Sequence, residues 1–157
     1  RKSKGGFYRS ISEEMLRLDG EMEGAGCRIY GLAADALNQS IDVAHEERLT
    51  RQQYLMFGLA DMLANVDLGA RLGRRAFARV IDGVADSENV KLISRLFANE
   101  TAQMVSQGIL KIVMGCGACD LDMTNSFMQK IAYTELTASC QNIINDMDKL
   151  ADIVFER

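Results

Sequence analysis

The sequence QYLMFGLADMLANVDLGARLGRRAFARVI, residues 53–81, decides the fold of this chain. Its apolar and small residues recur every three or four positions, at Leu55, Leu59, Met62, Val66, Gly69, Gly73, Phe77 and Val80. Such spacing places them in one stripe along a helix, and that stripe has to be covered by other helices. The chain contains no proline that would interrupt the pattern. We therefore predict one long helix over 51–81, capped by Thr50 and Gln53 and ending near Gly83.

Two further stripes of the same kind flank this helix. One comprises Ile11, Met15, Leu18, Met22, Ala25, Ile29, Leu32 and Ala36, and the other Leu136, Cys140, Ile143, Met147, Leu150 and Val154. They predict a helix from Ser10 to about Ala44 and another from Asp122 or Thr124 to the C-terminus. A third helix, after the one over 51–81, would be capped by Asp86 or Ser87 and stop at Gly115 and Gly117, with Val90, Ile93, Phe97, Met104, Leu110 and Val113 as its apolar residues. Short connections favour antiparallel neighbours, so we expect an all-α, up-down-up-down four-helix bundle of long helices, with 1–157 as one domain.

Four glycines interrupt the first predicted helix, at positions 20, 24, 26 and 31. Glycine inside a helix costs up to about 1 kcal/mol relative to alanine, so it needs a reason. We expect either a close approach between helices or a kink near Gly24 and Gly26. A ligand or partner contact along this small-residue face is the alternative.

Composition limits the possible functions. The 48% hydrophobic and 25% charged residues are typical of a globular chain, and the net charge of −4 argues against a general nucleic-acid binder. No apolar run reaches the roughly 18 residues that span a bilayer, and no basic amphipathic segment favours membrane association. The four cysteines do not suggest a secreted disulfide scaffold. We expect a cytoplasmic, reducing location, and, because the chain begins at Arg1 without a methionine, a piece of a longer protein.

The most distinctive local motif is Cys116-Gly117-Ala118-Cys119. A C-x-x-C pair can form a reversible disulfide or half of a zinc site. The other cysteines, Cys27 and Cys140, lie in helical patterns far along the chain and are interpreted as small buried hydrophobes. We expect a tight turn between helices whose thiols are incidental. A redox module or a metal site remains the alternative.

His45 is the only histidine, and Asp42-x-x-His45 faintly resembles a helical metal pair. A di-iron bundle needs two Glu-x-x-His motifs, and a Ser-His-Asp or Cys-His site would also have to use this one histidine. We therefore predict no catalytic, cofactor-binding or metal-binding residue in the chain.

The best candidate functional surface is a face of four arginines, Arg71, Arg74, Arg75 and Arg79. Their spacing of i, i+3, i+4 and i+8 places them on one side of the predicted helix. Guanidinium groups together can hold phosphates, anionic lipid or an acidic protein surface. The alternative is a solvated face paired with Asp67, Asp82 and neighbouring helices.

The second predicted helix also carries a family resemblance. The run from Gln53 through Tyr54, Leu59-Ala60-Asp61 and Leu63, followed by Leu72-Gly73-Arg74-Arg75-Ala76, resembles the C-terminal helical domain of acyl-CoA dehydrogenases of the very-long-chain type. That domain has a Gln-aromatic-Leu opening, a Leu-Ala-Asp and then a Leu-Ser-Arg-Ala-like stretch. The next helix, with Glu100-Thr101-Ala102, is similar to the helix that follows there. The resemblance is clear over 50–112 and looser on both sides.

The resemblance implies an accessory and assembly domain of a flavoenzyme that oxidises fatty acyl-CoA to trans-2-enoyl-CoA. In that family FAD, substrate and the catalytic glutamate belong to the preceding region, whose Arg-x-x-Phe-Gly and Gly-Gly-x-Gly-Tyr marks do not occur here. No catalytic or flavin-binding residue carries over. The implied partners are the parent enzyme's catalytic region and further copies of the chain in a homo-oligomer. A free-standing interaction module or adaptor that uses the face of Arg71, Arg74, Arg75 and Arg79 is the alternative.

Overall fold

The computed structural model describes residues 6–115, 117 and 120–155, and within them every regular element is helical. The elements are α1 (Gly6–Glu21), α2 (Cys27–Glu46), the short 3-10 helix η1 (Leu49–Arg51), α3 (Gln53–Ile81), α4 (Ser87–Val113), α5 (Leu121–Lys130), α6 (Tyr133–Ala138) and α7 (Ile143–Val154). The all-α prediction is thus confirmed for the described residues.

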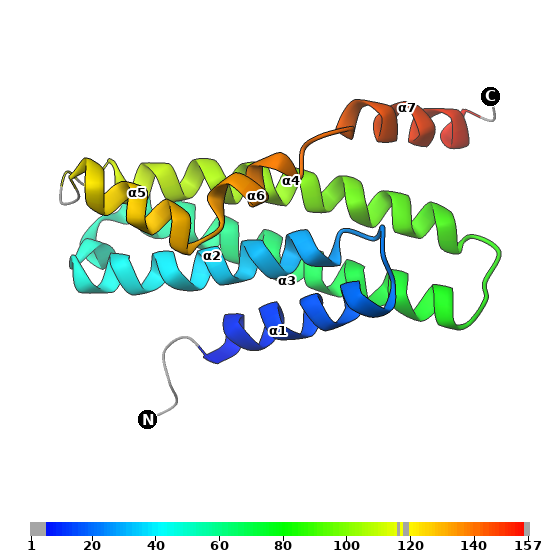
Figure 1. Ribbon diagram of the computed structural model, residues 1–157, viewed down its shortest axis with the longest axis horizontal. Coiled ribbons are helices and arrows are strands. Elements are labelled where there is room, and N and C mark those ends of the chain that lie inside the picture. Colours follow the sequence, from blue (N-terminus) through cyan, green and yellow to red (C-terminus); the bar gives the residue numbers. More distant parts are fainter. Residues whose placement is uncertain (1–5, 116, 118–119, 156–157) are drawn as a thin grey trace.

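Successive long helices run in opposite directions (Figure 1). The helices α1 and α2 form one hairpin and α3 and α4 another, and α2 packs against α1, α3 and α4. At one end of the long helices, α6 packs against α2 and α4, and α5 contacts α6. At the other end, α7 packs on α4 (Figure 1).

The prediction of one helix from Ser10 to Ala44 is wrong. The chain turns back between α1 and α2, where Gly24 and Gly26 have φ angles of 87° and 78°. Only glycine adopts these values without strain. A Cβ on Gly26 would also lie 2.5 Å from the Cβ of Ala98, so the turn is pressed against α4. Both expectations for these glycines are therefore met at this turn. The helix breaks at Gly24 and Gly26, and the turn packs closely on α4.

The prediction of one helix from Asp122 or Thr124 to the C-terminus is also wrong. The chain breaks into α5, α6 and α7 at Ala132 and Asn142, which adopt left-handed φ angles of 50° and 68°. The helix α5 begins earlier than predicted, after Asp120, whose side chain accepts a hydrogen bond from the Met123 amide. Of the predicted stripe, Leu136 is buried, but Met147 and Val154 are exposed.

The two central helices match their predicted ranges closely. On α3 the predicted stripe is buried from Leu55 to Gly73, and Phe77 and Val80 are partly buried against the core. On α4 the predicted stripe is less accurate, since Ile93 and Met104 are exposed. Small polar residues such as Ser94 and Ser106 are buried instead, because α4 contacts helices on several sides. The Thr50 cap is wrong, because Gln52 precedes α3 and makes no side-chain cap.

The core is organised around Tyr30 on α2, which is fully buried. Its hydroxyl donates a hydrogen bond of 2.7 Å to the backbone carbonyl of Ser94 on α4. Its ring fills the space above Gly69 on α3, where a Cβ would lie 2.2 Å from Cε1 of the tyrosine. Gly69 in the predicted stripe of α3 therefore leaves room for the aromatic ring of Tyr30 from α2. Through this ring and its hydrogen bond, Tyr30 contacts both α3 and α4.

Candidate functional site

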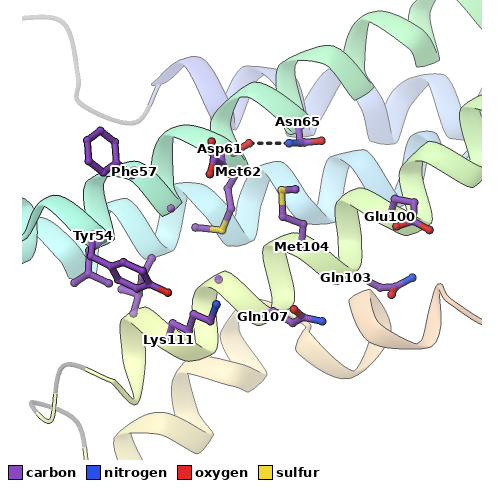
Figure 2. A pocket seen from close by; sticks show the side chains of 14 residues that line it. Tyr54, Phe57, Asp61, Met62, Asn65, Glu100, Gln103, Met104, Gln107 and Lys111 are labelled. Carbon is purple, nitrogen blue, oxygen red and sulfur yellow. Dashed lines mark hydrogen bonds between the residues drawn. The ribbon is translucent and has the colours of Figure 1, made fainter.

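An open groove lies between the first half of α3 and the second half of α4 (Figure 2). Its volume is about 500 Å³, and α3 contributes one wall and α4 the other. The residues of α3 that line it are Tyr54, Leu55, Phe57, Gly58, Asp61, Met62 and Asn65, and those of α4 are Glu100, Gln103, Met104, Gln107, Gly108, Lys111 and Ile112. The groove lies wholly within the part of the chain that carries the resemblance.

Glycines on both walls account for the shape of the groove. A Cβ on Gly108 would lie 2.4 Å from the Met62 sulfur, so this glycine lets the Met62 side chain lie against α4 as part of the floor. Gly58 faces open space, since a Cβ on this residue would meet no atom within 4 Å. Met62 and Met104 lie between the two helices (Figure 2). Met62 is buried, whereas Met104 is partly exposed, and a flexible, polarizable methionine side chain suits a surface that adapts to a partner.

Large apolar side chains stand exposed at the rim of the groove. Tyr54 is 72% exposed, Phe57 70% and Met104 40%. An exposed apolar patch framed by polar residues is typical of a surface that another molecule covers. The two ends of the groove carry opposite charges. The cationic Lys111 lies near Tyr54, and the anionic Glu100 lies at the opposite end (Figure 2).

The lining of the groove combines apolar, amide and charged side chains. The described lining has no histidine, cysteine, serine or threonine, and its titratable side chains are those of Tyr54, Asp61, Glu100 and Lys111. Asn65 uses its side-chain amide to donate to the backbone carbonyl of Asp61 on its own helix. Hydrophobic side chains with a few amides and separated charges match the composition of a helix-binding groove.

The predicted arginine face is largely neutralised within the chain. Arg71 contacts Asp67 on the same helix at 3.0 Å, and Arg79 contacts Asp86 at 3.3 Å. Arg74 reaches across to α1, where its Nε and Nη2 donate to the two carboxylate oxygens of Glu14 at 2.8 and 2.6 Å. These hydrogen bonds lower the pKa of Glu14 and raise that of Arg74.

Arg75 is the remaining member of the face. It is exposed, and no ion pair forms between it and the described part of the chain. The structure therefore brings the four arginines onto one helix, as predicted, but three of them have acidic partners from this chain. Of the two partners named from the sequence, Asp67 is found and Asp82 forms no ion pair with these arginines among the described residues; Glu14 on α1 is a partner on a neighbouring helix, as the alternative expected.

The cysteine and histidine predictions have different outcomes. Cys116 and Cys119 lie outside the described residues, and so does Ala118 of the same motif. Cys27 is fully buried, as expected of a small hydrophobe, and burial raises the pKa of its thiol to about 11. Cys140 is partly buried. No cluster of three or more metal-ligating side chains occurs among the described residues, His45 included.

A polar clasp between Arg95 and Asp146, which no local sequence pattern indicates, fixes α7. The Nε and Nη2 atoms of Arg95 on α4 donate to both carboxylate oxygens of Asp146 on α7, at 2.6 and 2.7 Å. The Nη1 atom of Arg95 donates to the backbone carbonyl of Gly24 at 2.7 Å. The hydrogen bonds from Arg95 lower the pKa of Asp146, which is 6% exposed. One guanidinium thus joins α4, α7 and the turn between α1 and α2.

Comparison with known proteins gives no match to a family model, a curated protein or a solved structure. No helix in the described ranges has the length and apolar character needed to cross a membrane.

Proposed function

We propose that this chain is the C-terminal accessory and assembly domain of a flavin-dependent acyl-CoA dehydrogenase. In this proposal the parent enzyme oxidises fatty acyl-CoA to trans-2-enoyl-CoA, and its FAD and catalytic glutamate belong to the preceding region. The chain described here supplies helical surfaces for assembly and takes no part in the chemistry.

The observation that carries this proposal is the groove between α3 and α4. The residues that resemble the family, 50–112, include both of its walls, and they expose Tyr54 and Phe57 at its rim. Exposed aromatic side chains beside a preformed groove support a binding role, and aromatic residues contribute much of the energy of protein interfaces.

The proposal includes a finer description of the fold. We take α1, α2, α3 and α4 as the up-down-up-down bundle, in place of the four helices predicted from sequence. The alternating directions and the packing of α2 against the other three support this. The helix α6 then covers part of α2 and α4, α7 packs on α4, and α5 contacts α6.

Extending the reading frame upstream of Arg1 tests the proposed function. We expect the longer chain to purify with bound flavin and to reduce an electron acceptor when given fatty acyl-CoA. The chain of 157 residues should be colourless after gel filtration. An upstream sequence without a flavin-binding dehydrogenase region would overturn the proposal and favour a free-standing interaction module.

A further inference from the structure

A second, smaller pocket lies where the turn between α6 and α7 and the first half of α7 meet α4. Its volume is about 310 Å³, and α2 contributes Ile29 to its wall. Since a water molecule takes up roughly 30 Å³ of the liquid, the pocket has room for a ligand of about ten non-hydrogen atoms. The pocket is separate from the groove between α3 and α4, because no residue lines both.

The base of this pocket holds a buried acceptor atom that is unpaired. Asn99 on α4 lines the pocket and is only 1% exposed, yet its side-chain oxygen Oδ1 has no hydrogen-bond partner among the described residues. Leaving a buried acceptor unpaired is unfavourable, and such atoms in folded proteins are nearly always paired. The Oδ1 atom is therefore an acceptor for an N–H or O–H group of a molecule that enters the pocket.

The mouth of the pocket supplies hydrogen-bond donors. Three exposed side-chain amides line it, those of Gln141, Asn142 and Asn145. They lie at the start of α7, where the backbone amides of Ile144 and Asn145 donate to no acceptor in the described part of the chain. The N-terminal end of a helix carries partial positive charge and unpaired N–H groups. This end of the pocket therefore suits an anionic group.

The charged side chains of the described lining have the same preference. Arg95 and Lys149 are its cations, and Asp146 is its anion. The carboxylate of Asp146 already accepts two hydrogen bonds from Arg95 and lies 3.9 Å from Nζ of Lys149. The lining thus has one surplus positive charge on a chain whose net charge is −4. The side chain of Lys149 is 66% exposed, so it is free to turn toward an anion at the mouth.

We propose that this pocket binds a small carboxylic acid that also carries a hydroxyl or amino group. The hydroxyl or amino group donates to Oδ1 of Asn99 at the base. The carboxylate accepts hydrogen bonds from the amides at the start of α7 and from Lys149. An alcohol alone would leave the α7 amides unpaired, and a simple carboxylate would leave Asn99 unpaired. The inference does not rest on the proposed function, since the pocket and the groove share no residue.

Four small probes separate the two requirements. D-Glycerate carries a carboxylate and two hydroxyls, L-serine a carboxylate, an ammonium and a hydroxyl, propionate only the carboxylate, and glycerol only hydroxyls. Titration of the Asn99 side-chain amide signal by NMR measures each Kd on the chain of 157 residues. We expect glycerate or serine to bind with a Kd of about 1 mM or lower, and propionate and glycerol roughly tenfold more weakly. The comparison of glycerate with serine distinguishes a hydroxyl donor from an amino donor.

Variants test the two ends of the pocket, with calorimetry as the readout. Asn99→Leu removes the Oδ1 acceptor at similar volume and should weaken binding by roughly tenfold or more. Lys149→Ala removes an exposed charge and should weaken it by about two- to fivefold. Because Asn145 is also exposed, Asn145→Ala and Lys149→Ala keep the test decisive if Asn99→Leu fails to fold. Lys130→Ala, an exposed lysine on α5 outside the pocket, is the matched control and should leave the Kd unchanged.

Ligand binding should also slow hydrogen exchange in α7, because the ligand contacts α4 and α7 together. Absence of binding by glycerate and by serine would overturn the inference. Equal binding of propionate or glycerol would also overturn it, as would an unchanged Kd in a folded Asn99→Leu chain or in both exposed variants. If a longer chain binds flavin while the pocket takes none of the probes, the proposed function stands and this inference alone fails.

Discussion

The hairpin of α3 and α4 and the segment from α5 to α7 are held in place by different contacts. The hairpin buries side chains over nearly its whole length, against α2 and between its own helices. The C-terminal segment consists of three shorter helices, and α7 contacts the rest of the molecule through α4, where the Arg95–Asp146 clasp lies. Apolar periodicity predicts a continuous helix where neighbours cover the stripe. Apolar periodicity does not predict the C-terminal segment, because Ala132 and Asn142 adopt left-handed φ angles that end the helices and the Arg95–Asp146 contact fixes α7.

The largest expected effect comes from filling the space that Gly69 leaves for Tyr30. In Gly69→Ala the new Cβ would lie 2.2 Å from the tyrosine ring, which is buried and hydrogen-bonded to the Ser94 carbonyl. Overpacking typically costs about 1–3 kcal/mol, and this site should lie at the upper end. Urea unfolding at neutral pH measures the loss.

The matched control is Gly58→Ala in the same helix. A Cβ there meets no atom within 4 Å, and alanine favours the helix more than glycine does. This change should stabilise the chain by about 0.5–1 kcal/mol. Equal destabilisation by both changes would mean that the Tyr30 contact does not determine the packing of α3.

A smaller and more local effect is expected from Arg95→Ala. It leaves the carboxylate of Asp146, which is 6% exposed, without its two strongest donors. Because the side chain of Arg95 is 32% exposed, water can replace part of the contact. We expect a loss of about 2 kcal/mol, less than for a fully buried pair. Hydrogen exchange should show faster exchange in α7 than in α3.

Lys149→Ala is the control for the clasp. Lys149 lies 3.9 Å from Asp146 Oδ1 and its side chain is 66% exposed, so its removal should change the exchange of α7 little. Equal loss of protection in α3 and α7 in the Arg95→Ala chain would show that the two regions unfold together.

Acid should affect the two ion pairs in a defined pH range. Glu14 and Asp146 have pKa values below their ordinary values of 4.5 and 3.8, mainly because of hydrogen bonds from Arg74 and Arg95. A carboxyl group with a lowered pKa contributes stability above its ordinary pKa and loses it as the pH falls through the folded value. Stability should therefore decrease progressively below about pH 4.5. Unfolding of the Asp146→Asn chain should depend less on pH in this range than that of the unmodified chain.

The smallest effects are expected on the arginine face. Arg74→Ala removes the bidentate, half-buried ion pair with Glu14 that joins α1 and α3, and it should lower the free energy of unfolding by about 1 kcal/mol. Arg71→Ala removes an exposed pair within one helix and should cost less than about 0.5 kcal/mol. Arg75→Glu should leave helicity and thermal stability nearly unchanged. A large loss from Arg75→Glu would show a contact of that residue beyond those described.

Particular residues show how far the sequence predicts this molecule. The range of α3 follows from its stripe, because each turn contributes a residue to the core. The turn at Gly24 and Gly26 has a visible signal in two glycines, although the pattern continues across it. The breaks at Ala132 and Asn142 have almost none, since alanine is a good helix former and asparagine only tolerates the left-handed region.

The site was predictable only in part. Tyr54, Phe57 and Asp61 lie off the stripe of α3 at steps of three and four residues, which is a signal for a second face. Whether that face is covered depends on how closely α4 approaches, and Gly108 determines this through its contact with Met62. The Arg95–Asp146 clasp joins residues 51 positions apart, and no local pattern specifies such a pair.

The burial of Tyr30 also gives the molecule an alkaline limit and a means of observing it. Burial raises the pKa of this phenol above its ordinary value of 10.0, so the folded state keeps it protonated. Above about pH 10 an unfolded chain releases this proton more readily, and stability falls as pH rises. The chain has no tryptophan and only four tyrosines. Absorbance of the phenolate that appears last in an alkaline titration therefore reports the separation of α2 from α3 and α4 without any added label.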